Sequence, residues 1–324
     1  MLDRRSVLNG GSALLLASAL PAAAQEKYPT KPVTIIVASA AGGGTDIMAR
    51  LLAEKMRGDL GQTIVVENKP GAGGNIGADF VSRAPKDGHT LLMTAGALAI
   101  APSLYAKLSF DPLKDLTGVA WLAIAPLIVV TKPDNKLNSM NDLLDLARRE
   151  GKKVTFGSFG GGTPSHLGGE SINHLAKVSM THVPYARGGA MLDVLSGDIN
   201  VAILDALSTI PYITSGKLRA LAVTGPQRFE VLPDVPTLSE AGVPFETVGW
   251  HGMFAPSGTP KTVIDRMNAA VTKALALPDV RERIVAGGSL PIEPAYSAEQ
   301  WNVRFRQDVA SWAQVVKAAN VKVE

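Results

Sequence analysis

The sequence predicts an α/β protein of two lobes, each with a doubly wound sheet, joined by a hinge of two chain segments. Short β-branched runs, glycine-rich turns and helical periods follow one another in the βαβ order of parallel sheets. This order occurs near the start of the chain and again after about residue 150. Two apolar segments, 119–131 and 246–256, stand where the chain would cross between the two sheets.

The first lobe begins with the run VTIIVA at Val33–Ala38, whose continuous apolar character is typical of a parallel strand buried on both faces. After a glycine loop, Ile47, Leu51, Leu52 and Met56 mark one face of a helix. Further strand and helix signals complete the βαβ pattern. The elements predicted here are Val33–Ala38, Ile47–Leu60, Thr63–Glu67, Ile76–Arg83 and Thr90–Thr94.

The second lobe repeats this order without a detectable sequence repeat. Thr163 is a predicted N-cap, and Pro164 takes the first helical position that proline favours. The strands predicted here are Val154–Phe159, Met180–Tyr185, Val201–Leu204 and Arg219–Thr224. The helices predicted here are Ser165–Ala176, Ala190–Ser196 and Leu207–Thr214.

The remaining chain is predicted to be helical and to close over the first lobe, with helices at Pro260–Ala276, Asp279–Ala286 and Ser297–Asn320. We therefore expect residues 25–124 with 250–324 to form lobe 1, and residues 125–249 to form lobe 2. Because ligands bind at the carboxyl ends of parallel strands, we expect a binding cleft between the lobes.

The N-terminus has the pattern of an export signal, residues 1–24. Arg4 and Arg5 precede a short apolar stretch, and Ala22–Ala24 supply the small residues before a predicted cleavage at Gln25. The apolar stretch is shorter than the roughly 20 residues that span a bilayer. The paired arginines fit either a twin-arginine signal or an ordinary secretion signal. The mature protein is expected in the periplasm.

Composition excludes several functional classes. The chain has no cysteine, and none of its 5 histidines forms a metal-ligand pair, so we expect neither a metal nor another cofactor. The net charge is only +3 and no long basic run is present, which argues against nucleic-acid binding.

Three glycine loops come before predicted helices, at Gly42–Thr45, Gly71–Gly74 and Gly160–Thr163. Such a loop can simply make a tight turn, or it can present helix N–H groups to an anion. Three loops at the same position of the βα pattern favour a binding cleft. None has the spacing of a nucleotide-binding loop.

Asp205 follows a strand, where it can cap a helix, face the ligand, or do both. His166 lies in the first turn of a helix, where a neutral form is favoured. It is either a hydrogen-bonding partner of the ligand or a packing residue. Ser158, His166 and Asp205 have the residue types of a catalytic triad, but no GxSxG motif supports a triad.

The motifs together resemble the Bug-type extracytoplasmic receptors of tripartite tricarboxylate transporters. The matching stretches include VENKPGAGGNIG at 66–77, FGSFGGGTPSHLGGE at 156–170 and LPDVPTLSEAGVP at 232–244, and they cover nearly all of the chain after the signal. The resemblance implies a type II periplasmic-binding fold and no catalysis. It also implies a small organic acid as ligand, a mono- or dicarboxylate with aromatic acids included, which is passed to membrane permease subunits. A monomer is expected.

The resemblance also implies a set of ligand contacts made by loop main chain and hydroxyls. These contacts are Ser39, Ala40, Gly43, Gly44, Thr45, Gly73, Gly74, Thr94, Ala95, Ser158, Gly160, Gly161, Thr163, His166 and Asp205. Ser39 departs from the family, which usually has an aromatic residue there, and Ala95–Ala97 lacks the usual hydroxyls. We therefore expect a roomier and less polar cleft than is typical.

Two rival functions remain open at this point. A solute sensor that signals to a kinase would use the same two lobes as a transport receptor. An enzyme on the same fold would turn over its ligand, whereas a receptor would bind it without forming product.

We predict that the exported protein begins at or near Gln25, because the basic, apolar and small-residue segments follow the order of a cleavable signal. Intact-mass measurement of the protein from the periplasmic fraction checks this start. A soluble cytosolic pool that retains Met1 would contradict the prediction.

Overall fold

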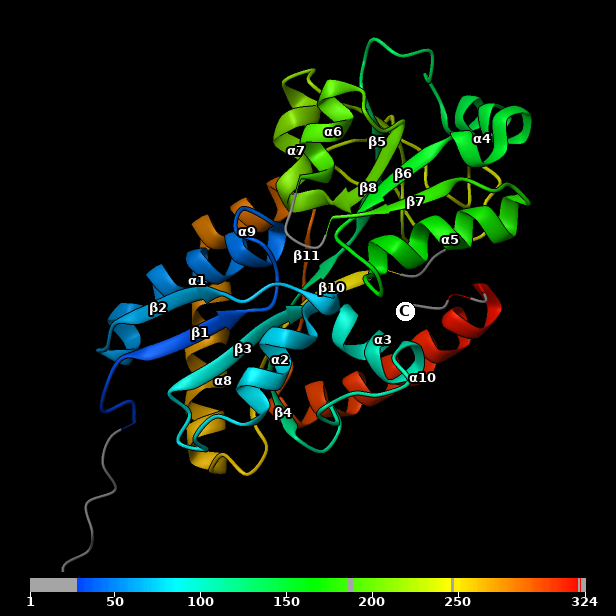
Figure 1. The fold of residues 1–324 in the computed structure, drawn as a ribbon. Helices are drawn as coiled ribbons and strands as arrows, with labels where there is room; N and C mark the ends of the chain where they lie inside the picture. The colour runs from blue at the N-terminus through cyan, green and yellow to red at the C-terminus, as the bar shows by residue number, and fades with distance from the viewer. Residues whose placement is uncertain (1–27, 186–188, 246–247, 320, 322–324) are drawn as a thin grey trace, which may run out of the picture.

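Two sheets with helices on both faces make up the structure, a computed structural model that describes residues 28–185, 189–245, 248–319 and 321 (Figure 1). The first sheet has six strands in the order β11-β4-β10-β3-β1-β2, and the second has five in the order β7-β6-β8-β5-β9. The predicted fold class, two doubly wound α/β lobes, is confirmed.

The first sheet contains a parallel core. β1 (Val33–Val37) lies between β2 (Ile64–Asn68) and β3 (Thr90–Ala95) and is parallel to both. β10 (Gly249–Pro256) is antiparallel to β3 and to β4 (Leu116–Ala125), and the short β11 (Leu290–Pro291) completes the sheet. One face packs on α1 (Gly44–Leu60), α8 (Lys261–Leu275) and α9 (Pro278–Ala286), and the other on α2 (Asn75–Ser82), α3 (Ala97–Leu104) and α10 (Ala298–Ala319).

The second sheet is built in the same way. β6 (Thr155–Ser158) is parallel to β7 (Thr181–Pro184) and β8 (Val201–Asp205), whereas β5 (Leu127–Thr131) is antiparallel to β8 and β9 (Arg219–Val223). Its faces pack on two helix pairs. The pairs are α4 (Met140–Glu150) with α5 (Pro164–Ala176), and α6 (Ala190–Ser196) with α7 (Ala206–Thr214).

The long apolar segment 119–131 is not one crossing strand. It ends β4 at Ala125 and starts β5 at Leu127, so each sheet receives one strand from it. Pro126 stands between them, and its carbonyl accepts a hydrogen bond from the Ala206 amide at 3.1 Å. Proline has no N–H to continue a ladder, which explains why the strand breaks there. The return segment forms β10, although residues 246–247 lie outside the described residues.

Helices α3 and α4 and the strand β11 were not predicted. The sequence does carry a start signal for α4, because Ser139 and Asp142 form a reciprocal capping box. Helix α3 has no such signal, since its N-cap is Gly96 and it contains Pro102. Its apolar sequence is stabilised by burial under α10 rather than by local propensity.

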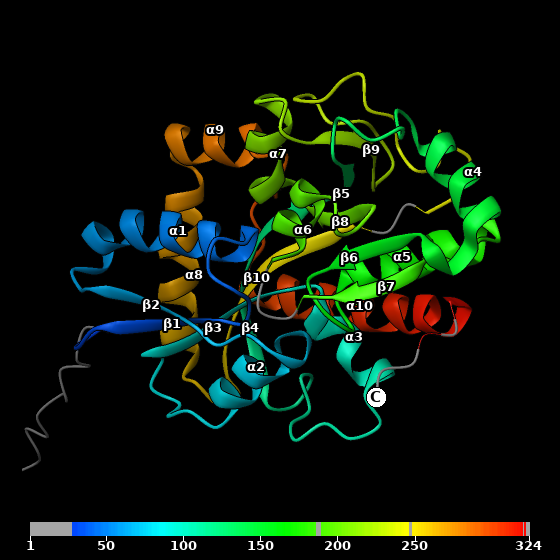
Figure 2. The ribbon, with the colours of Figure 1, turned by 45° about the horizontal axis from the view of Figure 1, so that its top comes forward.

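The C-terminal helix α10 closes over the first lobe as predicted, and it also touches the second lobe (Figures 1 and 2). Trp301 is fully buried and packs with Trp250, Phe254 and Phe305 in the first-lobe core. Further along α10, Val315 packs against core clusters of both lobes. This helix is therefore a third connection between the lobes, beside the two chain crossings.

Two helix glycines should respond oppositely to replacement by alanine. A Cβ at Gly169 in α5 would stand 2.1 Å from a ring carbon of Phe156, whose fully buried ring has no room to move. We expect Gly169→Ala to lower the free energy of unfolding by about 1–3 kcal/mol. Gly58 in α1 is exposed with open space around it, so Gly58→Ala should raise that free energy by about 0.5–1 kcal/mol.

Urea denaturation of both variants measures the two changes against the unmodified protein. Equal stabilisation by the two alanines would contradict the close packing of α5 on Phe156.

Candidate ligand-binding site

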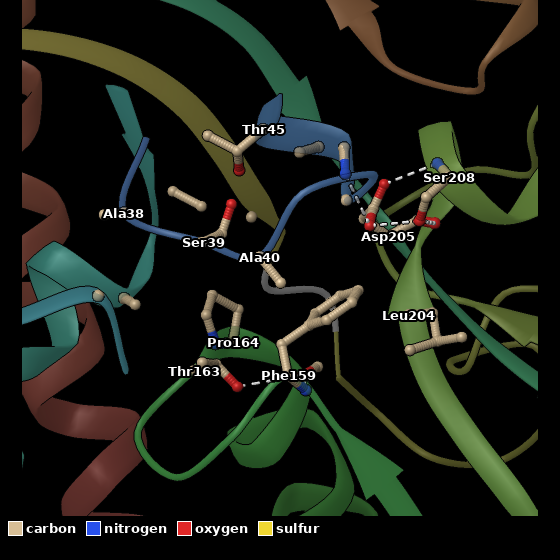
Figure 3. A pocket seen from close by; sticks show the side chains of 18 of the residues that line it. Ala38, Ser39, Ala40, Thr45, Phe159, Thr163, Pro164, Leu204, Asp205 and Ser208 are labelled. Atoms are coloured by element: carbon tan, nitrogen blue, oxygen red, sulfur yellow. Dashed lines mark hydrogen bonds between the residues drawn. The ribbon is translucent and has the colours of Figure 1, made fainter. Parts of the chain in front are cut away.

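A cavity of about 240 Å³ lies between the two sheets, at the carboxyl edges of their parallel strands (Figure 3). Its first-lobe wall comes from the loops after β1 and β3, from residues before α2, and from the start of β10. Its second-lobe wall comes from the loop after β6, the starts of α6 and α7, and β8. The lining residues are 38–45, 71, 73, 74, 94, 95, 97, 125, 127, 159, 163–165, 185, 189–191, 204, 205, 208 and 249–251.

Helices of both lobes begin at this cavity. From the first lobe these are α1, α2 and α3, and from the second lobe α5, α6 and α7. Each helix start carries a partial positive charge and N–H groups that lack a partner within the helix. Within the described part of the lining, no lysine or arginine is present and Asp205 is the one acidic residue.

The first-lobe helices have no side-chain caps at their starts. The N-caps of α1, α2 and α3 are Gly43, Gly74 and Gly96, and none provides a side-chain hydrogen bond. Glycine is needed at position 74 because its φ is +97°, and a Cβ there would stand 3.1 Å from the Ala38 carbonyl oxygen. The helix starts on this side can therefore be approached by a ligand.

Polar side chains accompany these starts. The Thr45 hydroxyl lies 3.2 Å from Nδ1 of His251, and both residues line the cavity. His251 is 2% exposed, and within the described residues its Nε2 atom has no partner, as is also true of Ser39 Oγ. Burial lowers the pKa of His251, although the charge of Asp205 acts in the opposite direction. A neutral His251 can thus offer one unused polar atom to a ligand.

Two of the second-lobe helices, α5 and α7, are capped by side chains, whereas the short α6 begins at Gly189 without one. The Thr163 hydroxyl accepts from the His166 amide at 3.3 Å, and Pro164 follows at the first helical position, as predicted. Asp205 is the N-cap of α7 and accepts from the Ser208 amide at 2.9 Å and the Ser208 hydroxyl at 2.6 Å. The N-cap role predicted for Asp205 is confirmed.

Asp205 also reaches across to the first lobe. Its Oδ2 atom accepts a hydrogen bond from the Gly44 amide, the first N–H of α1, at 3.3 Å (Figure 3). A Cβ at Gly44 would stand 2.2 Å from this carboxylate, so only glycine allows the approach. Tyr105 makes a second contact between the lobes, because its hydroxyl donates to the Gly161 carbonyl at 3.2 Å.

Apolar side chains form much of the remaining wall. The Phe159 ring points into the cavity from the second lobe, between Ala40 and Leu204 (Figure 3). Met191 and the Tyr185 ring lie on the same side of the cavity. The Tyr185 hydroxyl donates to Asp193, and burial together with this carboxylate raises its pKa to about 12.

The structure brings most of the predicted site residues to the cavity. Those that line it are Ser39, Ala40, Gly43, Gly44, Thr45, Gly73, Gly74, Thr94, Ala95, Thr163 and Asp205. Their predicted part in binding stays a prediction, because no ligand is present.

Ser158, Gly160, Gly161 and His166 do not line the cavity. Ser158 is fully buried and lies 2.6 Å from Nε2 of His182. His166 stacks on His182 with ring centroids 3.9 Å apart, and its Nδ1 accepts from the Gly162 amide. In the third glycine loop, the Gly160 carbonyl accepts from the Thr163 hydroxyl and the Gly161 carbonyl accepts from the Tyr105 hydroxyl.

The hypothetical triad is not assembled. Ser158 contacts His182 rather than His166, and Asp205 is occupied by Ser208 and Gly44. Arg187 is a basic residue that could compete with the neutral donors as a partner of a ligand carboxylate, and it lies outside the described residues.

The sequence did not predict the lining residues Tyr185, Met191, Leu204 and His251. A signal was available for Tyr185, which is the last residue of the predicted strand Met180–Tyr185. His251 could not be found in this way, because the antiparallel β10 reaches the cavity from its beginning rather than its end.

The described residues contain no group of three or more His, Asp or Glu side chains that could hold a metal ion. Nor does any helix in the described ranges combine the length and apolar character needed to cross a bilayer.

Two α/β lobes with a cavity at both carboxyl edges define a periplasmic-binding type of solute receptor. Similar solved structures agree. The periplasmic binding protein BugD is 36% identical with a TM-score of 0.87, covering 92% of this chain and 100% of that one. MatC from Rhodopseudomonas palustris with bound malate is 33% identical with a TM-score of 0.85, covering 89% and 100%. An R. palustris protein with adipate is 30% identical with a TM-score of 0.86, covering 91% and 99%.

The family model of the tripartite tricarboxylate transporter family receptor, TctC, matches residues 48–321. The chain belongs to this family, and the resemblance to Bug-type receptors is confirmed.

The stacked histidines beside the site should make the protein sensitive to acid. Burial lowers the pKa of His166 to about 4, and burial with the nearby His166 lowers that of His182 to about 3. The unfolded chain binds these protons near pH 6.5, so stability is retained above that pH and lost as pH falls toward 4 and 3. We expect a loss of up to about 1.4 kcal/mol per pH unit for each histidine.

Urea denaturation between pH 7.5 and 4.5 measures this slope. His182→Gln removes one titrating ring and keeps a polar side chain beside Ser158, so its slope should be shallower. An unchanged slope in this variant would show that other groups cause the acid sensitivity.

Proposed function

We propose that this protein is a periplasmic receptor that binds a small carboxylate-bearing solute between its lobes and delivers it to the membrane subunits of a transporter. Residues 25–124 with 250–324 form one lobe in this proposal, and residues 125–249 form the other. The observation that carries it is the convergence of helix starts from both lobes on one cavity. That arrangement attracts an anion without a basic side chain.

Neutral donors can supply the affinity. A hydrogen bond to a charged group contributes about 1.5–3 kcal/mol, so two or three such bonds support micromolar binding after the costs of association. Thr45 is suited to this role because its hydroxyl and the start of α1 belong to one loop. The acids bound by MatC and by its adipate-binding relative support the carboxylate class.

Contacts between the lobes support binding by closure. The Gly44–Asp205 and Tyr105–Gly161 hydrogen bonds join loops that belong to different sheets. Closure about two chain crossings excludes water and brings both walls against the ligand. Binding and release of an intact solute require only these contacts and this closure, and we propose no catalysis.

A thermal-shift screen with malate, adipate, hexanoate and phenylacetate tests the receptor role. An acid present at about 100 times its dissociation constant should stabilise the protein by roughly 2.7 kcal/mol. Recovery of the acid unchanged after incubation separates a receptor from an enzyme. Consumption of the acid would contradict the proposal.

For the acid that binds best in this screen, Thr45→Val should weaken binding tenfold or more, about 1.4 kcal/mol, because the isosteric side chain loses its hydroxyl. Asp205→Ala should have a similar effect, since it removes the contact with α1. Arg187→Ala should change affinity by less than about threefold. Calorimetric titration measures all three. Lost binding in a folded Arg187→Ala protein would mean that the carboxylate clamp is ionic.

A further inference from the structure

We propose that the solute carries a single carboxylate, held by the first-lobe loops, and an apolar tail that lies against the Phe159 wall of the second lobe. This inference rests on the proposed receptor function and specifies its ligand. The two walls of the cavity differ in the groups that they present to a ligand.

The first-lobe wall is the one with polar groups available to a ligand. The helices α1, α2 and α3 start at glycines that provide no side-chain cap, although the first amide of α1 already donates to Asp205. An independent observation points the same way. His251 lines this wall and is 2% exposed, yet its Nε2 atom lacks a partner among the described residues. A buried polar atom without a partner is costly, and a ligand carboxylate would relieve that cost at His251.

The starts of α5 and α7 in the second-lobe wall have already used donors, and the third helix start there, that of the seven-residue α6, has no side-chain cap. The His166 amide donates to the Thr163 hydroxyl, and the Ser208 amide donates to Asp205. Pro164 has no N–H, and the Phe159 amide donates to the Ser165 hydroxyl at 3.0 Å. The Tyr185 hydroxyl is engaged by Asp193, so its ring is what remains for the cavity.

The Phe159 side of the cavity gives a second charge no basic partner in the described lining. The Asp205 carboxylate is the one acidic side chain in that lining, and its bond to the Gly44 amide places it where the two walls meet, so its charge does not distinguish them. A second ligand carboxylate would have to lie beside the Phe159 ring. Burying an unpaired charge in this way is strongly unfavourable. An alkyl or phenyl group would instead gain contact with Phe159, Leu204 and Met191.

Hexanoate and adipate provide a matched test, because they share a six-carbon chain and differ in whether its far end is a methyl group or a carboxylate. We expect the dissociation constant of hexanoate to be at least tenfold lower than that of adipate in calorimetric titration at pH 7.5. The uncharged hexanamide should bind at least tenfold more weakly than hexanoate. Phenylacetate, which has one carboxylate, should bind about as tightly as hexanoate. Malate, which has two, should bind as weakly as adipate.

The outcomes separate the two proposals. Adipate or malate binding as tightly as hexanoate overturns the single-carboxylate inference and leaves a carboxylate receptor. If none of the four acids binds at millimolar concentration, both proposals are overturned. Equal binding of hexanamide and hexanoate would overturn the first-lobe carboxylate contact.

Variants at Phe159 test which wall holds the tail. Phe159→Lys places a cation there, so hexanoate should bind at least tenfold more weakly and adipate at least tenfold more tightly. Phe159→Leu keeps an apolar side chain and should retain the preference for hexanoate. Thermal melting confirms that both variants are folded. An unchanged hexanoate-to-adipate ratio in folded Phe159→Lys would show that the tail does not contact this wall, and the inference would fail.

Discussion

The direction of the parallel strands governs the chemistry of this protein. A parallel strand that leads into a helix places the start of that helix at the carboxyl edge of its sheet. β1 leads to α1, β3 to α3, β6 to α5, and β8 to α7. Because these edges of both sheets border one cavity, the positive ends of several helices meet there. The charge needed for an anion comes from the backbone, and the described lining has no basic side chain.

Local capping then makes the two walls different. Glycine caps on the first-lobe helices leave the approach to the backbone open. Thr163 and Asp205 cap the starts of α5 and α7 in the second lobe, whereas α6 starts at Gly189 without a side-chain cap. Asp205 has an additional effect, since its carboxylate bonds the first N–H of α1. The same side chain thus closes one lobe's helix and ties the two lobes together.

The connections between the lobes constrain how they can move. The chain crosses at the β4–β5 junction and returns before β10, while α10 lies against both α3 and α5. Trp301 anchors α10 in the first-lobe core through contacts with Trp250 and Phe254. These buried rings fix α10 to the first lobe, so a relative motion of the lobes would change its contact with α5.

Much of the fold could be predicted from local patterns. Strands such as Val33–Val37 are continuous apolar runs, and helix starts such as Thr163-Pro164 carry their own capping chemistry. These signals need only neighbouring residues. For the same reason, the capping box of α4 could be recognised in the sequence, whereas α3 has no such signal. The family motifs placed the glycine loops in order, and the cavity contains most residues of the first two loops.

The tertiary structure alone decided which of those residues face the cavity and what surrounds them. Ser158 and His166 stand beside the third glycine loop in sequence, yet their partner is His182 from a neighbouring strand, and both are directed into the lobe. His251 reaches the cavity because β10 is antiparallel to β3, a pairing between residues far apart in the chain. The sequence by itself determined which loops offer backbone donors, because helix caps and turns depend on neighbouring residues. The walls around them depend on long-range packing, which no local pattern records.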